Sequence, residues 1–457
     1  MRIRHAEQTI TRATSGPSRE VLDYEDAPLT PFHVRVALSC TGGYFSDGFA
    51  LGIIGLAIAA ATPHLHLTPA WDGLLGGGSL AGLFFGALLT GPAADRFGRR
   101  LIFLFTMPFL AAISLAQGFV SSAAQLLVLR LILGFLLGAD YVVSQAMLSE
   151  FSLRRLRGRM LGSLQSAWVF GYVCAYFVGY SLTDIGPTSW RWMLMCSAVP
   201  ALLILPLRIT IPESPLWLIG RGRSSEAGQI VRDKIAADVD LAPTVMAVPA
   251  LRARWRQLFS RTWRRRTIIG CIFYTCQVIP FFAFGTFVPT VLSALKVQGN
   301  YWGGLIYNAF LVLGTVLGIL VIDKISRRSF LIGSFAITAS AMVALSSSAS
   351  WSSSSVVTLF AVFAFVLSAA ANLESLYLSE LFPTELRASG IGLVIAASRV
   401  GAATGTFLLP IVVSQLGVGP ALKSCAAVLG FGGLACLLWA PETRNAQMGA
   451  SGASDNA

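Results

Sequence analysis

The chain has 457 residues, of which 55% are hydrophobic and only 12% are charged, and its formal net charge is +12. Soluble proteins carry about 25% charged residues. A chain of this length with a mean hydropathy of +0.69 has too much apolar surface to fold in water, so lipid must be its solvent. Composition therefore excludes a soluble globular protein, and the positions of the basic residues explain their excess.

The first 33 residues are polar, and they lack the short apolar core and small-residue cleavage site of a secretory signal peptide. A helix that crosses a bilayer needs about 20 predominantly apolar residues. The rest of the chain supplies twelve such stretches. We expect membrane-spanning helices at residues 34–61, 71–92, 100–119, 123–149, 159–182, 190–211, 267–294, 302–322, 329–348, 354–378, 388–416 and 420–440.

Basic residues occur in alternate loops between these stretches. They gather after the second, fourth, eighth and tenth stretches and in residues 212–266, whereas residues 62–70, 120–122 and 349–353 hold none. An excess of Lys and Arg marks the cytoplasmic side of a membrane. We therefore expect both termini and residues 212–266 to be cytoplasmic, in a multi-pass protein of the inner (plasma) membrane. Because this topology accounts for the basic excess, we expect no nucleic-acid partner.

Two charged signatures each occur twice, about half a chain apart. The first reads Gly91-Pro-Ala-Ala-Asp95-Arg96-Phe-Gly-Arg99-Arg100 after the second stretch, and it returns after the eighth as Asp323-Lys-Ile-Ser-Arg327-Arg328. The second has Glu150 and Arg157 after the fourth stretch, and it returns after the tenth with Glu380 and Arg387. This duplication predicts a cytoplasmic segment at 1–33, a six-helix half at 34–211, a cytoplasmic linker at 212–266, a second six-helix half at 267–440 and a cytoplasmic tail at 441–457.

These signatures are where the sequence resembles the major facilitator superfamily, from about residue 33 to residue 444. Within it the chain looks like the sugar-porter and metabolite:proton symporter branch, on Arg130, on Glu150 with Arg157-Gly-Arg159, on Pro212-Glu-Ser-Pro-Leu-Trp-Leu218 and on Pro441-Glu-Thr-Arg444. The resemblance implies an all-α membrane protein with twelve transmembrane helices in two pseudo-symmetric six-helix halves. It also implies a transporter whose central site opens to each side of the membrane in turn.

The charged signatures predict a conformational latch at the cytoplasmic ends of the helices. Carboxylates there can pair with arginines from neighbouring helix ends through directional, breakable hydrogen bonds. We expect such pairs to hold the two halves together when the cytoplasmic side is shut. The latch set comprises Gly91, Asp95, Arg96, Arg99, Arg100, Arg130, Glu150, Arg157, Asp323, Arg327, Glu380 and Arg387.

Two aspartates lie at membrane depth, where a charged residue costs about 2.5–3.5 kcal/mol to insert. A carboxyl group in such a site favours its neutral form and can exchange a proton. Asp47 lies in a segment that resembles the first-span motif of aromatic-acid and other metabolite:proton symporters, with Ala50 in place of a second aspartate. Asp140 lies in Gly-Ala-Asp140-Tyr, which resembles phosphate and metabolite:proton symporters. We expect both to couple transport to protons; a structural hydrogen-bonding role is the alternative for Asp47.

Arg130 and Asp140 are ten residues apart on one predicted helix, about 15 Å along its axis, so they cannot pair with each other. Each therefore needs a partner on another helix or a wet cavity.

Glu374 and Arg399 lie at membrane depth in the tenth and eleventh stretches. One interpretation is a buried ion pair that positions these helices, and the other is that Arg399 binds a substrate anion while Glu374 is protonated. Gln277, Asn372 and Gln165 complete the expected substrate-binding set. The Gln-Gln-x-Ser-Gly motif of hexose porters is replaced by Cys-Gln277-Val-Ile, so a standard hexose site is incomplete. We expect the many Trp and Phe residues to face lipid or to pack.

The whole sequence predicts a secondary active transporter that moves a small polar metabolite with protons by alternating access, an organic acid being favoured over a sugar or polyol. Efflux of a drug or metabolite by proton antiport is one alternative, and a non-transporting sensor with the same fold is another. The sequence contains no phosphate-binding loop, metal-ligand cluster or nucleophile–base pair. We therefore expect no enzymatic activity, cofactor or metal, and a protein that acts as a monomer in lipid.

Overall fold

The computed structural model describes residues 22–23, 26–235, 239–240, 255–295, 300–322, 324–348, 351–382 and 384–443. Within this part of the chain, 12 helical segments are long and apolar enough to cross a membrane. Each lies at one of the predicted positions, with ends that differ by a few residues. The prediction of an all-α membrane protein with twelve spans is therefore confirmed.

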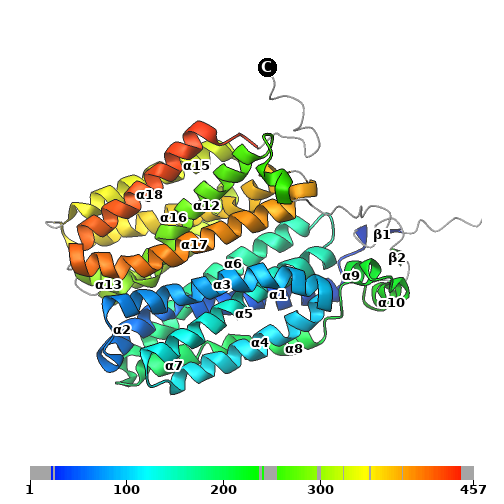
Figure 1. The fold of residues 1–457 in the computed structure, drawn as a ribbon, viewed down its shortest axis with the longest axis horizontal. Helices are drawn as coiled ribbons and strands as arrows, with labels where there is room; N and C mark the ends of the chain where they lie inside the picture. The colour runs from blue at the N-terminus through cyan, green and yellow to red at the C-terminus, as the bar shows by residue number, and fades with distance from the viewer. Residues whose placement is uncertain are drawn as a thin grey trace, which may run out of the picture.

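The first six spans form one half of the molecule, which occupies the lower part of Figure 1. Its first span is broken at Ile53 into α1 and α2, and its sixth span is divided into α7 and α8. The elements are α1 (Pro31–Gly52), α2 (Ile54–Leu65), α3 (Pro69–Phe97), α4 (Arg99–Ala116), η2 (Gln117–Phe119), α5 (Ala123–Phe151), α6 (Arg157–Ser181), η3 (Thr183–Ile185), α7 (Ser189–Met195) and α8 (Ala198–Ile209).

The last six spans form the second half, in the upper part of Figure 1. A short helix follows the seventh span, as α2 follows α1 in the first half. The elements are α12 (Arg264–Thr286), α13 (Val288–Ala294), α14 (Asn300–Ile322), α15 (Arg327–Ser346), α16 (Ser353–Leu381), α17 (Thr384–Leu416) and α18 (Val418–Trp439).

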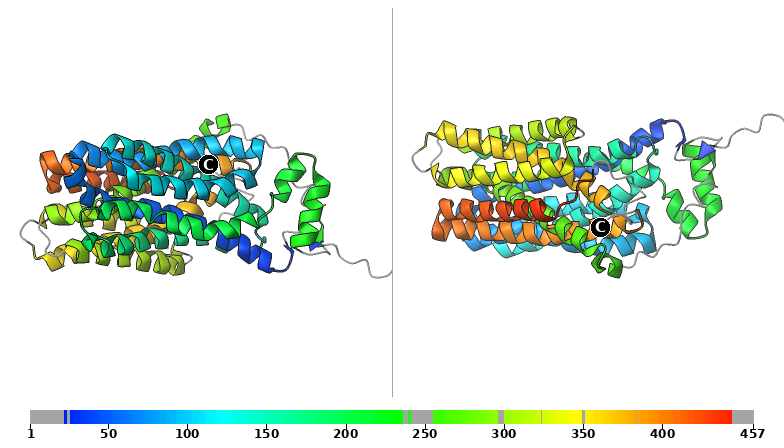
Figure 2. Two further views of the ribbon diagram at one scale, coloured as in Figure 1. Left: turned by 90° about the horizontal axis from the view of Figure 1, so that it is seen from below. Right: turned by 90° about the horizontal axis from the view of Figure 1, so that it is seen from above.

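Between the halves the chain leaves the bundle. It forms α9 (Pro215–Gly220), α10 (Ser224–Lys234) and the short helix η4 (Trp255–Phe259), and strand β2 (Val239–Asp240) pairs in parallel with β1 (Leu22–Asp23). Figures 1 and 2 show α9 and α10 beyond one end of the bundle. We call this the linker end of the molecule and the opposite one the far end.

Several spans begin where the sequence supplies a helix cap. The Thr68 hydroxyl accepts a hydrogen bond from the backbone N–H of Trp71 at 3.4 Å, and Pro69 fills the first helical position of α3. Ser122 caps α5 and Ser352 caps α16 in the same way. A hydroxyl at this position satisfies one of the backbone donors that a helix start leaves free.

Small residues let neighbouring helices of one half approach closely. On α3, Gly82 faces the carbonyl of Leu131 in α5, and on α5, Gly134 faces the carbonyl of Ser79 in α3, so a side chain at either glycine would collide with backbone. Glycine at such crossings brings backbones into contact, which is how helices pack in lipid.

The two halves also meet through small residues, at the far end. Gly73 and Gly77 of α3 face the carbonyls of Phe407 and Ala403 in α17, and Gly55 of α2 faces the carbonyl of Thr286 in α12. All three glycines lie in the far-end portions of their helices. The structure is therefore closed at the far end.

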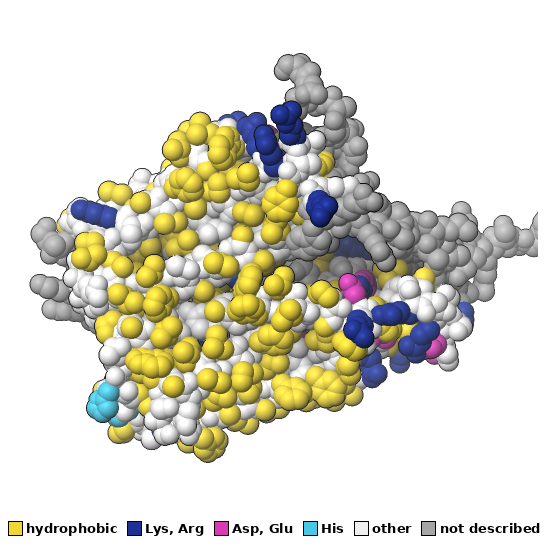
Figure 3. All heavy atoms as spheres, viewed as in Figure 1, with side chains coloured by type: hydrophobic (Ala, Val, Ile, Leu, Met, Phe, Trp, Pro, Cys, Tyr) yellow, Lys and Arg dark blue, Asp and Glu magenta, His cyan; other side chains and the backbone are white. Residues whose placement is uncertain are grey.

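The surface of the bundle is apolar around its flanks, as Figure 3 shows, and basic side chains gather mainly at the linker end. Large apolar side chains are exposed on the flanks of the bundle, for example Phe109 at 55%, Leu203 at 74% and Leu320 at 60%. A lipid environment covers such a surface without cost.

Candidate functional site

The carboxyl group of Asp47 lies inside the bundle, on α1. Its side chain is 0% exposed, and neither carboxylate oxygen has a hydrogen-bond partner within the described residues. Tyr44 lies one helical turn earlier, and its hydroxyl donates to the backbone carbonyl of Tyr141 in α5 at 3.3 Å. The two tyrosine rings lie 4.9 Å apart, and Tyr141 is within electrostatic range of Asp47. Asp47 is thus a buried carboxyl group with aromatic neighbours and no direct counterion in the part of the chain that the structure describes.

Asp140 of α5, in contrast, has a full set of partners. Arg208 of α8 donates to both of its carboxylate oxygens, through Nη1 to Oδ1 and through Nη2 to Oδ2 at 2.9 Å. Thr106 of α4 donates to Oδ1 at 2.8 Å and Ser144 donates to Oδ2 at 3.0 Å. Both charged side chains are 0% exposed. This is a buried, bidentate ion pair that joins three helices of the first half.

Arg208 is thus the direct counterion of Asp140, and the expectation that Asp140 couples transport to protons stays a prediction. The sequence predicted that Asp140 needs a partner on another helix or a wet cavity, and Arg208 of α8 is that partner. Sequence analysis missed Arg208, which lies near the end of the sixth predicted stretch. The pair also packs against α1: a Cβ at Gly43 would come within 2.7 Å of Asp140 Oδ2. It therefore lies about one helical turn from Asp47.

Arg399 of α17 and Glu374 of α16 face Tyr274 of α12. The Tyr274 side chain interacts with both, and the two charges also interact through space. No direct ion pair joins Glu374 to Arg399 in the described structure. The two charges thus interact through space without a direct pair, and both interpretations of Glu374 and Arg399 stay predictions. Arg399 instead lies with its guanidinium carbon 5.7 Å from the ring centre of Phe282.

Aromatic side chains from both halves meet beside Arg399. The Trp168 ring in α6 stacks on Tyr172 with centres 5.4 Å apart and planes at 23°. It also lies 5.9 Å from the rings of both Phe281 and Phe282 in α12. These rings lie inside the protein and pack on one another, which is one of the two arrangements expected for the aromatic residues. We call Asp47, Tyr141, Trp168, Tyr172, Tyr274, Gln277, Phe281, Phe282 and Arg399 the central cluster.

The predicted amide residues separate in the structure. Gln277 of α12 is 3% exposed, and neither its amide nitrogen nor its amide oxygen has a partner among the described residues. It lies on the same helix face as Tyr274 and Phe281, and Gln165 lies one turn before Trp168 on α6. Asn372, however, donates to the backbone carbonyl of Thr315 in α14 at 3.1 Å. Asn372 therefore joins two helices and does not belong to the central cluster in this conformation.

The first set of latch residues forms a compact module at the linker end. Glu150 of α5 pairs with the Arg99 guanidinium and accepts from the Ser214 hydroxyl. Glu213 accepts from the backbone N–H groups of Arg99 at 3.1 Å and Arg100 at 3.2 Å, at the start of α4. A carboxylate at a helix N-terminus satisfies free donors and complements the helix dipole.

The second half repeats this module. Arg327 Nε lies 3.5 Å from Glu380 Oε1, and the Thr443 hydroxyl donates to Glu380. Glu442 accepts from the backbone N–H groups of Arg327 at 3.1 Å and Arg328 at 3.2 Å, at the start of α15. Each of these contacts stays within one half, so here they brace the individual halves and do not join them.

The other latch residues have different surroundings. Asp95 has a side chain that is 75% exposed and lies 3.7 Å from Arg99, whereas Arg96 stacks on Phe97 and Gly91 has open space around it. Arg157 begins α6 at the linker end. Arg387 is placed only by its backbone in α17, and Asp323 lies outside the described residues.

Arg130 does not belong with the latch. It lies inside the first half, near the start of α5, and it donates to the backbone carbonyl of Ala50 at 3.3 Å. Because α5 starts at the far end, Arg130 is remote from the charged modules at the linker end.

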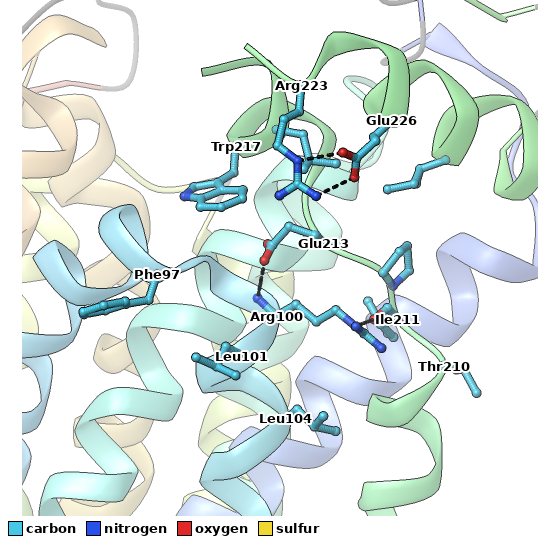
Figure 4. A pocket seen from close by; sticks show the side chains of 13 residues that line it. Phe97, Arg100, Leu101, Leu104, Thr210, Ile211, Glu213, Trp217, Arg223 and Glu226 are labelled. Carbon is cyan, nitrogen blue, oxygen red and sulfur yellow. Dashed lines mark hydrogen bonds and ion pairs between the residues drawn. The ribbon is translucent and has the colours of Figure 1, made fainter. Parts of the chain in front are cut away.

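A separate cavity of about 580 Å³ lies at the linker end between α4, α8, α9 and α10. Figure 4 shows its walls, with Arg100 bound to Glu213 and Arg223 bound to Glu226. Phe97 and Trp217 supply apolar surface. The cavity is bounded by the linker end of the first half and by the linker helices α9 and α10, and it is remote from the central cluster.

Twelve spans in two halves, with polar and aromatic groups meeting between them, define a membrane transporter of the major facilitator fold. The sequence matches the family described as "Sugar (and other) transporter" over residues 50–449, and the chain belongs to this family. It is similar to the inner membrane metabolite transport protein YgcS of Escherichia coli (strain K12), with 39% identity over 428 residues that cover 94% of this chain and 96% of the relative.

The putative metabolite transport protein YaaU of the same organism is 38% identical over 435 residues, which cover 94% of this chain and 96% of that protein. Among solved structures, the partially occluded inward open conformation of the xylose transporter XylE from E. coli matches with a TM-score of 0.79. That match covers 92% of this chain and 100% of the other, at 20% sequence identity, and shows the shared fold.

Proposed function

We propose that the protein is a proton-coupled symporter of a small polar metabolite, with an organic acid favoured over a sugar or polyol. The observation that carries the proposal is the burial of Asp47 without a hydrogen-bond partner in the described structure. An ionised carboxylate in such a place is strongly unfavourable, so this conformation favours the protonated side chain. A conformation that gives Asp47 water or a counterion would release the proton.

The charges around Asp47 fit this role. The Asp140–Arg208 pair lies one turn away, and its two charges nearly cancel, so it leaves Asp47 without a net counterion. Tyr44 and Tyr141 are neutral neighbours. We assign the proton to Asp47 and give the Asp140–Arg208 pair the task of holding α4, α5 and α8 together.

Most of the expected substrate contacts lie in the second half, and Gln165 lies in the first. Arg399 offers a cation, and Gln277 offers an amide that has no hydrogen-bond partner among the described residues. Tyr274 interacts with both Glu374 and Arg399 and so links the two charged groups. Gln165 lies nearby on α6. A solute that touches both halves binds each conformation differently, which is what alternating access requires. An anionic solute gains most from Arg399, which is why we favour an organic acid.

We further propose that the linker end faces the cytoplasm and that the protein lies in the inner membrane. Basic side chains gather at this end, and the positive-inside rule places such an end in the cytoplasm. The paired charged modules then act as the latch, bracing each half here and exchanging partners between halves when the cytoplasmic side shuts.

Uptake into proteoliposomes with an imposed pH gradient tests the proposal. Labelled organic acids, sugars and polyols are offered singly, with a protonophore as control. We expect an organic acid to accumulate above equilibrium and the accumulation to vanish with the protonophore. Equilibration that ignores the gradient would show a facilitator, and solute movement against the direction of proton flow would show an antiporter; either result contradicts the proposal.

A further inference from the structure

The central cluster combines two kinds of group that together restrict the substrate. The first is a set of flat rings. Trp168 and Tyr172 are stacked on α6, and Phe281 lies 5.9 Å from each of them, from the other half of the molecule. Phe282 stands nearly perpendicular to Trp168, at 76°. Aromatic groups arranged in this way favour another ring, in a stacked or edge-to-face position.

The second is the guanidinium of Arg399, which lies over the Phe282 ring. Among the described side chains Glu374 interacts with it through space but no carboxylate forms a direct ion pair with it, and its Nε has no hydrogen-bond partner. A guanidinium presents two parallel N–H donors that match the two oxygens of a carboxylate.

A third observation concerns polar groups beside the rings. Gln277 is almost fully buried, both ends of its amide are without partners in the described chain, and the Tyr172 hydroxyl is likewise unmatched. Buried polar atoms of this kind need a ligand or water to meet them. They can serve one or two polar substituents. A sugar, which carries a hydroxyl on nearly every carbon, needs more directed partners than this.

We propose that the central cluster binds a planar aromatic carboxylate, with its ring against Trp168 and Phe281 and its carboxylate on Arg399. Gln277 then meets a ring nitrogen or hydroxyl. This inference rests on the proposed function, since it names the class of solute that the symporter moves. The aromatic faces come from α6 and α12, so the ring binds at the interface of the two halves and its fit changes when they move.

Binding to the purified full-length protein in nanodiscs tests this directly by isothermal titration. The probes are benzoate, 4-hydroxybenzoate and nicotinate. The comparison compounds are cyclohexanecarboxylate, which keeps the charge without the flat ring, benzyl alcohol, which keeps the ring without the charge, and D-gluconate and D-xylose. We expect at least one aromatic acid to bind and the comparison compounds to bind about tenfold or more weakly.

Two substitutions locate the site. Arg399→Ala is expected to weaken binding of the aromatic acid about 10- to 100-fold, and Arg399→Lys is expected to recover little of it, because an ammonium group lacks the planar fork. Phe281→Ala is expected to weaken it about tenfold. Lys423→Ala and Phe431→Ala, at exposed positions of α18, are matched controls that should leave binding unchanged.

Several results would overturn the inference. They are equal binding of cyclohexanecarboxylate or gluconate, binding that survives Arg399→Ala, and failure of all three aromatic acids to bind a protein that melts cooperatively. Proton-driven accumulation of a non-aromatic solute would also overturn it while leaving the symporter proposal standing. Conversely, Arg399-dependent binding of an aromatic acid whose uptake ignores the pH gradient would contradict the symporter proposal and leave the inference about the solute standing.

Discussion

At the scale of single residues, the structure separates two aspartates that look alike in the sequence. Both are fully buried in membrane-spanning helices of the first half. Asp140 receives four hydrogen bonds from Arg208, Thr106 and Ser144, whereas Asp47 receives none within the described residues. The two aspartates therefore differ in their surroundings: Asp140 lies in an ion pair, and Asp47 has no counterion among the described residues.

The first prediction concerns the stability of the buried pair. Replacing Asp140 with Asn leaves the Arg208 cation without a counterion, and replacing Arg208 with Ala leaves the Asp140 carboxylate without one. We expect each substitution to destabilise the protein by about 3–5 kcal/mol. The double variant Asp140→Asn with Arg208→Met removes both charges and should recover much of that loss. Thermal melting in detergent, with Lys423→Ala at an exposed position as a control outside the pair, measures the effect.

Singly substituted proteins that melt with the wild type would contradict this account of the pair. So would an Asp140→Asn variant that is fully stable and transports solute without protons, because Asp140 would then be the proton carrier.

Sequence could locate these aspartates but not divide their roles. The hydropathy pattern shows that each aspartate lies inside an apolar stretch. The free energy needed to insert a charged residue there indicates that the residue has a function. The partner of Asp140 comes from a helix two spans later, and spacing along one chain does not reveal which helices touch. The aromatic part of the central cluster was missed for a related reason, because hydropathy does not tell an inward-facing aromatic side chain such as Trp168 from a lipid-facing one such as Phe109.

At the scale of helices, the repeated modules show why the charged signatures occur twice. Glu213 and Glu442 each accept from two backbone N–H groups, at the first turns of α4 and α15. Ser214 and Thr443, the next residues, each donate to the carboxylate of Glu150 or Glu380. The segment that follows each half therefore fastens the start of its third span to the end of its fourth.

The second prediction follows from this repetition. Glu213→Ala and Glu442→Ala each remove a carboxylate from a helix start, and we expect each to cost about 1 kcal/mol of stability. Hydrogen exchange should quicken selectively in residues 99–103 for the first variant and in 327–331 for the second. Exchange that changes equally throughout the bundle, or nowhere, would show that these carboxylates do not cap the helices.

Much of the helix pattern could be predicted from the sequence. The thickness of a bilayer fixes the length of a span, and caps such as Thr68-Pro69 mark where one begins. The break at Ile53 and the divided sixth span were not predicted, because the apolar composition continues through them. The membership of Arg130 in the latch was inferred from resemblance, and the direction of α5 places it at the other end.

At the scale of the whole molecule, the two halves close against each other through glycines at the far end. Gly73 of α3 and Gly55 of α2 meet backbone carbonyls of α17 and α12. Side chains at these positions have no room in this conformation, yet they would be harmless once the halves part at that end. Closure at the far end is therefore sensitive to single substitutions.

The third prediction is that Gly73→Val shifts the molecule toward a conformation open at the far end. Overpacking costs about 1–3 kcal/mol, which changes a two-state equilibrium about 5- to 150-fold. Spin labels at Leu65→Cys and Ser293→Cys, in a cysteine-free background, should move apart in pulsed EPR. Gly430→Val is the matched control, because Gly430 has open space around it. An unchanged distance in the Gly73 variant would refute the proposed closure.

The central claim is that protons cross the membrane with the solute by way of Asp47, and solute-evoked proton flux in proteoliposomes tests it most directly. Addition of the transported solute should make the outer medium alkaline for the wild type and for Asp184→Asn, an exposed control. For Asp47→Asn we predict loss of the proton flux while exchange of labelled for unlabelled solute persists. Proton uptake by Asp47→Asn at the wild-type rate would contradict the account.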